Sequence, residues 1–222
     1  MTDPLPTTRL PLLLVHGGLY DDMTAVAFWT ATGVTPALDR HIVVYTAEDR
    51  PDQPSTWSDE AGALAEIIDR QGWREVAVVA ASNGCSAALR LAVDRPDLVA
   101  RLVLAWPATA GDPVSDALIG HQIDELGPEG ATESLLSGQT IRGLSDAEIA
   151  TIDVDAVVWP TIPENQFHQG STVSALVGLL RRPLLMGGSP EAVHAGFAPF
   201  LDSFVSMLVE VSILDDDDQA GR

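Results

Sequence analysis

The sequence predicts an α/β protein with a mostly parallel central sheet of about six strands, helices on both faces and a small helical lid. Three observations predict this fold. Short unbroken apolar runs recur along the chain, as in strands buried on both faces of a sheet. Amphipathic segments with helical spacing alternate with them at the distance of a strand–helix–strand unit. Between residues 108 and 182 the strand signals fade, and short helices joined by Gly- and Pro-containing loops are expected instead.

The apolar runs share a high content of Leu, Val and Ile. The runs expected to form strands are Leu10–Val15, Ile42–Tyr45, Glu75–Ala81, Arg101–Trp106, Pro183–Gly188 and Leu208–Leu214. Helical spacing predicts helices that begin near Thr56, Gly84, Ser145 and Thr172, and one that carries Phe197 to Phe204. Parallel strands joined by such helices place all their carboxyl ends at one edge of the sheet.

The length and the apolar content predict a single domain. The chain has 222 residues, of which 46% are hydrophobic, and this is enough to fill one core. We expect residues 1–222 to form one α/β domain, with 108–182 as a lid insertion and 215–222 as an acidic tail. The run of four aspartates in that tail is typical of a solvated chain end.

The charge excludes several classes of function. A formal net charge of −20 repels nucleic acid and anionic membranes, so neither is expected as a partner. All twelve basic residues are arginines, which excludes a lysine Schiff base, a pyridoxal-phosphate anchor and a lysine-containing phosphate loop. The scattered histidines do not predict a metal site. We therefore expect a small-molecule substrate and no cofactor, whereas the oligomeric state is not predicted.

Cysteine usage and hydropathy predict a cytoplasmic protein. Cys85 is the single cysteine, so no internal disulfide can form and a reducing compartment is the simpler interpretation. The first residues do not resemble a secretory signal. No apolar run reaches the roughly 20 residues that a membrane-spanning helix needs.

A serine lies where a strand pattern changes to a helix pattern. Ser82 follows the apolar run 75–81, and beyond Gly84 the apolar residues recur with helical spacing. Ala80 stands two residues before the serine and Gly84 two residues after it. A sharp strand-to-helix turn brings backbone close on both sides of its central residue, so only small residues fit there. The spacing therefore predicts a serine on a tight turn.

These residues resemble a known family. The stretch AASNG at 80–84 is similar to the nucleophile elbow of the α/β-hydrolase superfamily, with Ala80 in place of the usual first glycine, and HGG at 16–18 resembles its His-Gly motif. The resemblance implies that Ser82 is a nucleophile and that the N–H groups of Gly18 and Asn83 form an oxyanion hole. The alternative is that these glycines only allow tight turns. His16 is expected to be structural.

The family's base and acid are not in their usual places. The family has a histidine after the last strand and a carboxylate after the preceding strand, but no histidine follows the last expected strand. The chain is therefore identified as a divergent, short member. Glu191 replaces the family's aspartate in a Gly-x-x-Asp position, or it is an ordinary first-turn acid of a helix. Asp112 is an alternative acid, or a turn residue before a proline.

Two other histidines are candidate bases. His168 lies in the expected lid loop, which could hang over Ser82, and His194 follows Glu191 by about one helical turn. The alternative for both is a structural or surface role. His121, on a lid helix, and His41, before a strand, are weaker candidates.

The resemblance implies a serine-dependent hydrolase or acyl transferase that acts on a small ester, lactone or amide. Two alternatives stay open. One is a non-hydrolytic enzyme of the same fold, a cyclase, lyase or isomerase that uses general acid–base chemistry. The other is a catalytically silent protein that binds a ligand between sheet and lid.

Overall fold

The computed structural model describes residues 9–18, 23–34, 42–49 and 53–212. The expected acidic tail at 215–222, the end of the last expected strand and His41 lie outside the described residues. None of the described helices is both long enough and apolar enough to cross a membrane.

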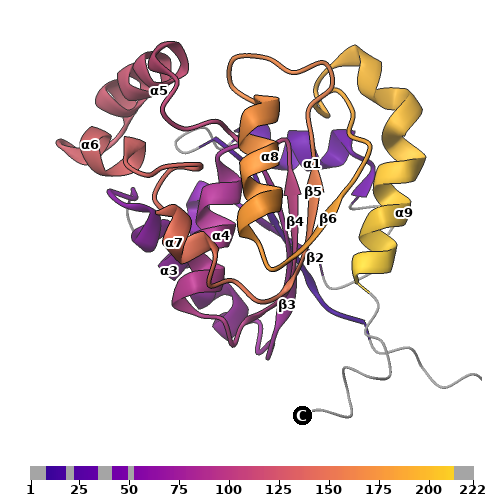
Figure 1. The fold of residues 1–222 in the computed structure, drawn as a ribbon. Helices are drawn as coiled ribbons and strands as arrows, with labels where there is room; N and C mark the ends of the chain where they lie inside the picture. Colours follow the sequence, from indigo (N-terminus) through magenta and orange to yellow (C-terminus); the bar gives the residue numbers. More distant parts are fainter. Residues whose placement is uncertain (1–8, 19–22, 35–41, 50–52, 213–222) are drawn as a thin grey trace, which may run out of the picture.

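A six-stranded parallel sheet forms the centre of the molecule (Figure 1). Its strand order is β2-β1-β3-β4-β5-β6, and every neighbouring pair is parallel. The strands are β1 Leu12–Val15, β2 Ile42–Tyr45, β3 Val76–Ala81, β4 Val99–Ala105, β5 Asp155–Trp159 and β6 Arg182–Leu185. The predicted fold class is confirmed. Because all strands run in one direction, the segments that follow them meet along one edge of the sheet.

Helices cover both faces of this sheet (Figure 1). The longer helices are α1 Met23–Ala31, α3 Trp57–Arg70, α4 Gly84–Asp94, α5 Pro113–Leu126, α8 Gly170–Leu179 and α9 Leu201–Val211. The short ones are η1 Ala47–Asp49, α6 Ala131–Leu136, α7 Asp146–Ile149 and η2 Ala195–Phe200. Residues of α3, α4 and α8 share one hydrophobic cluster, whereas residues of α1 and α9 belong to the cluster on the opposite face.

The two clusters differ in composition. The cluster under α3, α4 and α8 consists mainly of Leu, Ile, Val and Ala. The opposite cluster is rich in aromatic rings, where Trp106 stacks on Phe204 with ring centroids 5.4 Å apart and Phe204 also meets Trp159 edge-on at 5.2 Å. The aromatic cluster lies under the ends of β4 and β5, next to the loops that follow these strands.

The prediction of a strand at 208–214 is wrong for residues 208–212, which are the part of this range that the structure describes. Residues up to Val211 belong to α9, and Ser212 follows that helix. Its buried side chains are Phe204, Met207, Leu208 and Val211, and this spacing puts them on one helical face. The run of apolar and β-branched residues resembled a strand, but its period is that of a helix.

A strand lies within the range expected to be a helical lid. Residues 155–159 form β5, which pairs with both β4 and β6 inside the sheet. Acidic residues at 153 and 155 interrupt the apolar pattern before this short strand, and Asp155 is exposed at its start. The helical segment between β4 and β5 therefore spans 106–154, and the sheet has six strands although one expected strand is a helix.

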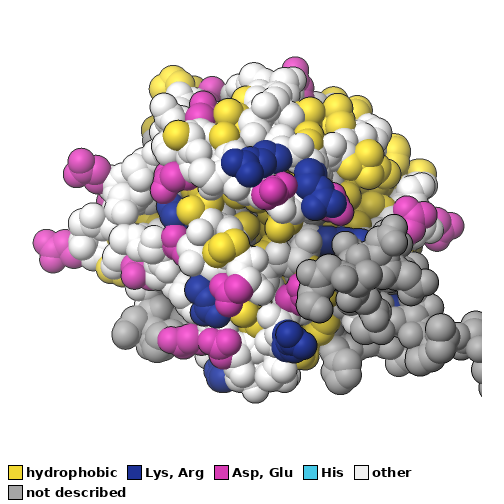
Figure 2. Space-filling view, turned by 60° about the horizontal axis from the view of Figure 1, so that its bottom comes forward, with side chains coloured by type: hydrophobic (Ala, Val, Ile, Leu, Met, Phe, Trp, Pro, Cys, Tyr) yellow, Lys and Arg dark blue, Asp and Glu magenta, His cyan; other side chains and the backbone are white. Residues whose placement is uncertain are grey.

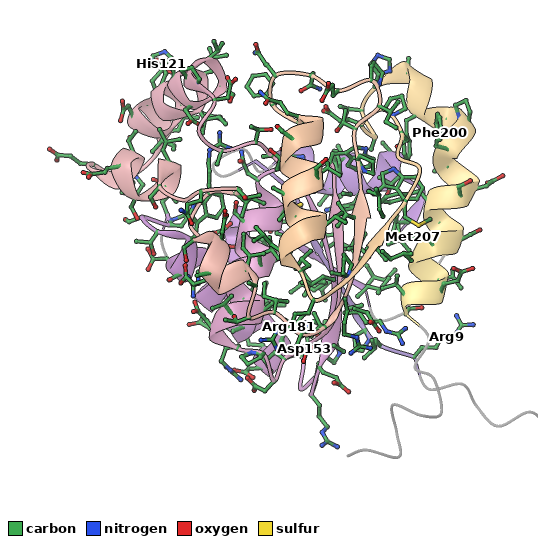
Figure 3. The ribbon with its side chains drawn as sticks, viewed as in Figure 1. Arg9, His121, Asp153, Arg181, Phe200 and Met207 are labelled. Carbon is green, nitrogen blue, oxygen red and sulfur yellow. The ribbon has the colours of Figure 1, made fainter. Side chains whose placement is uncertain are left out.

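Ion pairs mark the amino ends of the last two strands. Arg182 contacts Asp155 at 2.9 Å, and Arg181 contacts Asp153 at 3.6 Å; the second pair lies low in Figure 3. Figure 2 turns this end toward the viewer and shows arginine and acidic side chains next to one another. Exposed pairs such as these contribute little to stability.

Candidate active site

Ser82 occupies a strained turn between β3 and α4. Its φ is +54°, a left-handed conformation that residues with a Cβ rarely adopt. The Ser82 N–H donates to the carbonyl of Ala105 at the end of β4 (3.0 Å), and α4 begins two residues later at Gly84. The tight serine turn expected from the sequence is present.

Two glycines allow the backbone to pack around this turn. A Cβ added to Gly17 would lie 2.5 Å from the Cβ of Ser82 and 2.8 Å from the Asn83 nitrogen. A Cβ added to Gly84 would lie 2.7 Å from the carbonyl oxygen of Val15. Real Cβ atoms do not come this close to backbone, so neither position accommodates a larger residue without movement. The turn after β1 and the turn after β3 therefore support each other.

His168 contacts the serine. Its Nε2 lies 2.9 Å from the Ser82 Oγ, and only 7% of the residue is exposed. It comes from the loop between β5 and α8. Thr109 holds this loop from both sides, because its N–H donates to the carbonyl of Phe167 (2.7 Å) and its hydroxyl accepts from the N–H of Gln169 (2.9 Å).

Glu191 completes a hydrogen-bonded chain. Its Oε1 accepts from the His168 Nδ1 at 2.8 Å. The hydrogen bond from His168 lowers the pKa of the Glu191 carboxyl below its usual value, although partial burial acts in the opposite direction. An ionised carboxylate requires a proton on Nδ1, which leaves Nε2 as the acceptor for the Ser82 hydroxyl. This tautomer suits a histidine that removes a proton from serine.

Asn165 organises both partners of this chain. Its side-chain oxygen accepts from the backbone N–H groups of Phe167 (2.9 Å) and His168 (3.1 Å), and so it fixes the turn. Its side-chain N–H donates to the Glu191 Oε1 at 2.8 Å. This role of Asn165 was not predicted from the sequence. The signal was an Asn within a proline-containing loop just before a histidine, which is typical of many surface turns.

Ser189 joins the loops that follow β5 and β6. It is fully buried. Its hydroxyl accepts from the Trp159 indole (2.8 Å), its carbonyl accepts from the Trp106 indole (3.2 Å), and its N–H donates to the Pro160 carbonyl (3.1 Å). Because Ser189 stands two residues before Glu191, these bonds fix the position of the backbone that carries the Glu191 side chain.

The structure does not bring the other candidates to the serine. The His194 Nδ1 accepts from the N–H of Gly196 (2.9 Å) and caps η2. Asp112 caps α5 by accepting from the N–H groups of residues 114 and 115, and these bonds contribute to a lowered Asp112 pKa. His121 is 71% exposed on the outer side of α5 (Figure 3). In place of a catalytic contact, each makes an ordinary cap or surface interaction.

The two N–H groups expected to form the oxyanion hole, those of Gly18 and Asn83, differ in whether they already have an acceptor. The Gly18 N–H donates to the His16 Nδ1 at 3.1 Å, so in this conformation it is occupied, and His16 has the expected structural role. Asn83 lies at the amino end of α4, where backbone N–H groups have no partner within the helix. We find no acceptor for its N–H among the described residues. Within the described parts of the chain, the Asn83 N–H is therefore a donor that is available next to Ser82.

A polar cavity adjoins the His168 loop. Its volume is about 330 Å³, and its lining includes Thr109, Asp112, Thr140, Gln169 and Thr172. No basic side chain is among the described residues that line it. Within the described parts of the chain, no group of three or more His, Cys, Asp or Glu side chains could hold a metal ion.

Solved structures of similar fold include several hydrolases. The chain is similar to a meta-cleavage product hydrolase from Pseudomonas fluorescens, with a TM-score of 0.67, 18% identity and coverage of 91% of this chain and 90% of that one. It is similar to an esterase from Rhodococcus, with a TM-score of 0.65, 14% identity and coverage of 91% of each chain. The chain has the α/β-hydrolase fold.

Sequence comparison gives one shorter similarity. This α/β-hydrolase-fold chain is 40% identical over 90 residues to the lipase LipV from Mycobacterium tuberculosis. The match covers 38% of this chain and about a third (34%) of the lipase. No family model matches the chain.

The positions of His168 and Glu191 along the chain differ from those of the base and acid in the usual α/β-hydrolase arrangement. In the family, the acid follows the penultimate strand and the histidine follows the last one. Here His168 follows β5 and Glu191 follows β6, the last strand of the sheet. A histidine was expected after a strand at 208–214, but the last strand among the described residues is β6, and both Glu191 and His194 follow it. Because β5 and β6 are parallel neighbours, the loops that follow them lie side by side.

Proposed function

We propose that the protein is a serine hydrolase that acts on a small ester, lactone or amide. Ser82 is the nucleophile, His168 is the general base and Glu191 orients the histidine. The observation that carries this proposal is the hydrogen-bonded chain from the Ser82 Oγ to the His168 Nε2 (2.9 Å) and from its Nδ1 to Glu191 (2.8 Å). This is the arrangement that activates a serine hydroxyl, which is a poor nucleophile without a base.

The reaction begins with attack of the Ser82 Oγ on the substrate carbonyl carbon. His168 removes the hydroxyl proton as the C–O bond forms, and the imidazolium is stabilised by the ionised Glu191. The Asn83 N–H and the positive end of α4 stabilise the tetrahedral oxyanion. His168 then gives its proton to the leaving alcohol or amine, and an acyl-serine remains.

Water completes the turnover. His168 removes a proton from a water molecule, whose oxygen attacks the acyl-serine carbonyl. Collapse of the second tetrahedral intermediate returns the proton to the Ser82 oxygen and releases a carboxylic acid. A second N–H donor for the oxyanion becomes available if Gly18 turns away from His16, and both glycines that follow His16 allow such a rotation.

Neither a silent binding protein nor a non-hydrolytic enzyme requires the hydrogen bonds that link Ser82, His168 and Glu191. A silent binding protein has no need for a serine in a strained turn 2.9 Å from a buried imidazole. The esterase and the lipase among the similar proteins also support hydrolysis over isomerisation. The cavity beside the His168 loop has the size of a small-ligand pocket, and it adjoins the site without being lined by Ser82 or His168.

A fluorophosphonate probe and short-chain p-nitrophenyl esters test the proposal. We expect the folded protein to be labelled at Ser82 and to hydrolyse the esters. Ser82→Ala removes the nucleophile and His168→Ala removes the base, and we expect each to lower kcat by about 10⁶-fold. His194→Ala is the matched control and retains activity, because its ring caps η2 away from the serine.

Two results would contradict the proposal. One is a folded wild-type protein that the probe does not label and that hydrolyses none of the esters. The other is hydrolysis that persists at the wild-type rate in Ser82→Ala, which would favour general acid–base chemistry without a covalent intermediate.

A further inference from the structure

A buried arginine contacts the residue that follows the nucleophile. Arg142 lies in the loop between α6 and α7, and its side chain is only 1% exposed. Its Nη1 donates to the Asn83 Oδ1 at 2.9 Å, and its Nη2 contacts the Asp116 carboxylate on α5 at 2.5 Å. The guanidinium thus links the helical segment after β4 to the serine turn.

The burial of this guanidinium needs an explanation. A buried charge is costly unless its partners satisfy every donor. Asp116 balances the charge of Arg142, but the Arg142 Nε is buried and has no hydrogen-bond partner in the structure. A hydrophobic side chain of similar volume would fill the space without an unpaired donor. Packing alone therefore does not account for an arginine here.

The Asn83 side chain binds Arg142 and does not cap α4. Asparagine at the start of a helix commonly accepts a hydrogen bond from the first turn. Asn83 makes no such cap to α4, and its side-chain oxygen faces Arg142 instead. The backbone N–H of the same residue lies next to Ser82. The Arg142 contact therefore restrains the residue whose backbone N–H lies next to the serine.

We propose that Arg142 is a positioning residue that acts through Asn83 on the oxyanion side of the site. It holds the Asn83 amide in the direction needed to stabilise the oxyanion. Its guanidinium also adds positive potential there, which Asp116 reduces but does not remove. This inference rests on the proposed serine hydrolysis for its kinetic consequences, but the contact itself can be tested without activity.

Arg142→Gln is the test, and Arg90→Gln is its matched control. Arg90 on α4 also links this helix to the segment after β4, because its Nη1 contacts Glu148 on α7 at 2.8 Å. Among the described residues its hydrogen-bond partners are Asp94 and Glu148. We expect Arg142→Gln to lower kcat by about 10- to 100-fold with little change in KM, a smaller loss than removal of an oxyanion donor. We expect Arg90→Gln to keep the wild-type kcat.

A double-mutant cycle separates positioning from general damage. If Arg142 acts through Asn83, Arg142→Gln has little further effect on kcat in an Asn83→Ala background. Arg142→Lys is the second variant, in case the glutamine variant does not fold. It keeps the charge but loses the fork that reaches two partners, and we expect an intermediate kcat.

An NMR measurement tests the contact independently of catalysis. We expect the resonances of the Asn83 backbone N–H and side-chain amide to shift in Arg142→Gln and not in Arg90→Gln. An unchanged Asn83 amide, equal losses of kcat in the two glutamine variants, or additive effects in the double-mutant cycle would each overturn the role of Arg142. Absence of ester hydrolysis in the wild type would instead overturn the proposed function, and the NMR comparison would still decide the positioning.

Discussion

The two sides of the candidate site are built in different ways. On the nucleophile side, glycines at 17 and 84 let two backbone turns pack directly against each other around Ser82. On the other side, His168 and Glu191 are held by side-chain hydrogen bonds from Asn165 and by the buried Ser189. The nucleophile side depends on steric fit, whereas the histidine side depends on a polar network.

This difference affects how each side responds to substitution. Closely packed backbone has no room to shift locally, so an added methyl group displaces the whole turn. Removal of one donor from a polar network leaves its partner unsatisfied and weakens the bonds next to it. We therefore expect the histidine side to show graded losses that depend on how near a residue lies to His168.

After the losses expected for Ser82→Ala and His168→Ala, the largest effect is expected for Glu191→Gln. The amide cannot carry the negative charge that stabilises the imidazolium and fixes the Nδ1–H tautomer of His168. We expect kcat to fall by about 10⁴-fold, as for amide replacement of the acid in a serine protease. Steady-state kinetics on the p-nitrophenyl esters measure this. A loss below tenfold would mean that the carboxylate does not orient the histidine.

The next effect is expected for Gly17→Ala. The new methyl group would lie 2.5 Å from the Ser82 Cβ and must move the serine. Displacement of a reacting group by about 1 Å can lower the rate about 10²-fold, and we expect a loss of that order in kcat/KM together with a lower thermal stability.

Gly62→Ala is the control for this substitution. Gly62 lies in α3, and nothing lies within 4 Å of its added Cβ. We expect unchanged kinetics and a stability gain of about 0.5–1 kcal/mol from the helix propensity of alanine. Equal behaviour of the two alanine variants would contradict steric support of the serine turn.

A smaller effect is expected at Asn165. Asn165→Ala removes both the donor to Glu191 and the acceptor that fixes the His168 turn, and we expect kcat to fall about tenfold. Asn165→Asp keeps the acceptor but places a second carboxylate beside Glu191. If the donor is what matters, the aspartate variant loses as much activity as the alanine variant or more.

The smallest effect is expected for a residue pair away from the site, Arg90 and Glu148, and concerns the stability of the protein at low pH. The hydrogen bond from Arg90 is the main cause that lowers the pKa of Glu148 from 4.5 to about 2. Because the folded value lies below the unfolded one, the stabilisation is complete above about pH 4.5 and disappears as the pH falls toward about 2.

Glu148→Gln tests this pH dependence. Its side chain is 41% exposed, so we expect a destabilisation below about 1 kcal/mol at pH 7. Urea unfolding from pH 7 to pH 2 should show the two proteins converge in acid. A difference that grows as the pH falls would contradict the assigned direction.

Much of the fold could be predicted from the sequence because most of its signals are local. The buried runs that form β1 to β4 and the helix spacing after Gly84 need no distant partner to be recognised. Strand β5 was missed because acidic residues at 153 and 155 interrupt the apolar pattern, which leaves a run of only four apolar residues. The run at 208–211 was assigned to a strand because β-branched residues obscured a helical period.

The site residues that local sequence signals could predict are likewise the contiguous ones. Ser82, the Asn83 backbone and the small residues around them are contiguous, and steric rules identify such a turn. Glu191 and His168 were candidates without a shared geometry, because a helix and a strand separate them in sequence. Asn165 and Arg142 act through contacts that only the tertiary structure creates.

The order of these residues along the chain has a consequence for how such proteins are found. A search pattern written as nucleophile, then acid, then histidine passes over a chain that runs Ser82, His168, Glu191. A search for three side chains at the carboxyl edge of a parallel sheet, with no order imposed, detects it. In this protein the proposed base and acid come from two neighbouring loops that meet beyond the carboxyl ends of β5 and β6, so their position in space defines the site better than their order along the chain.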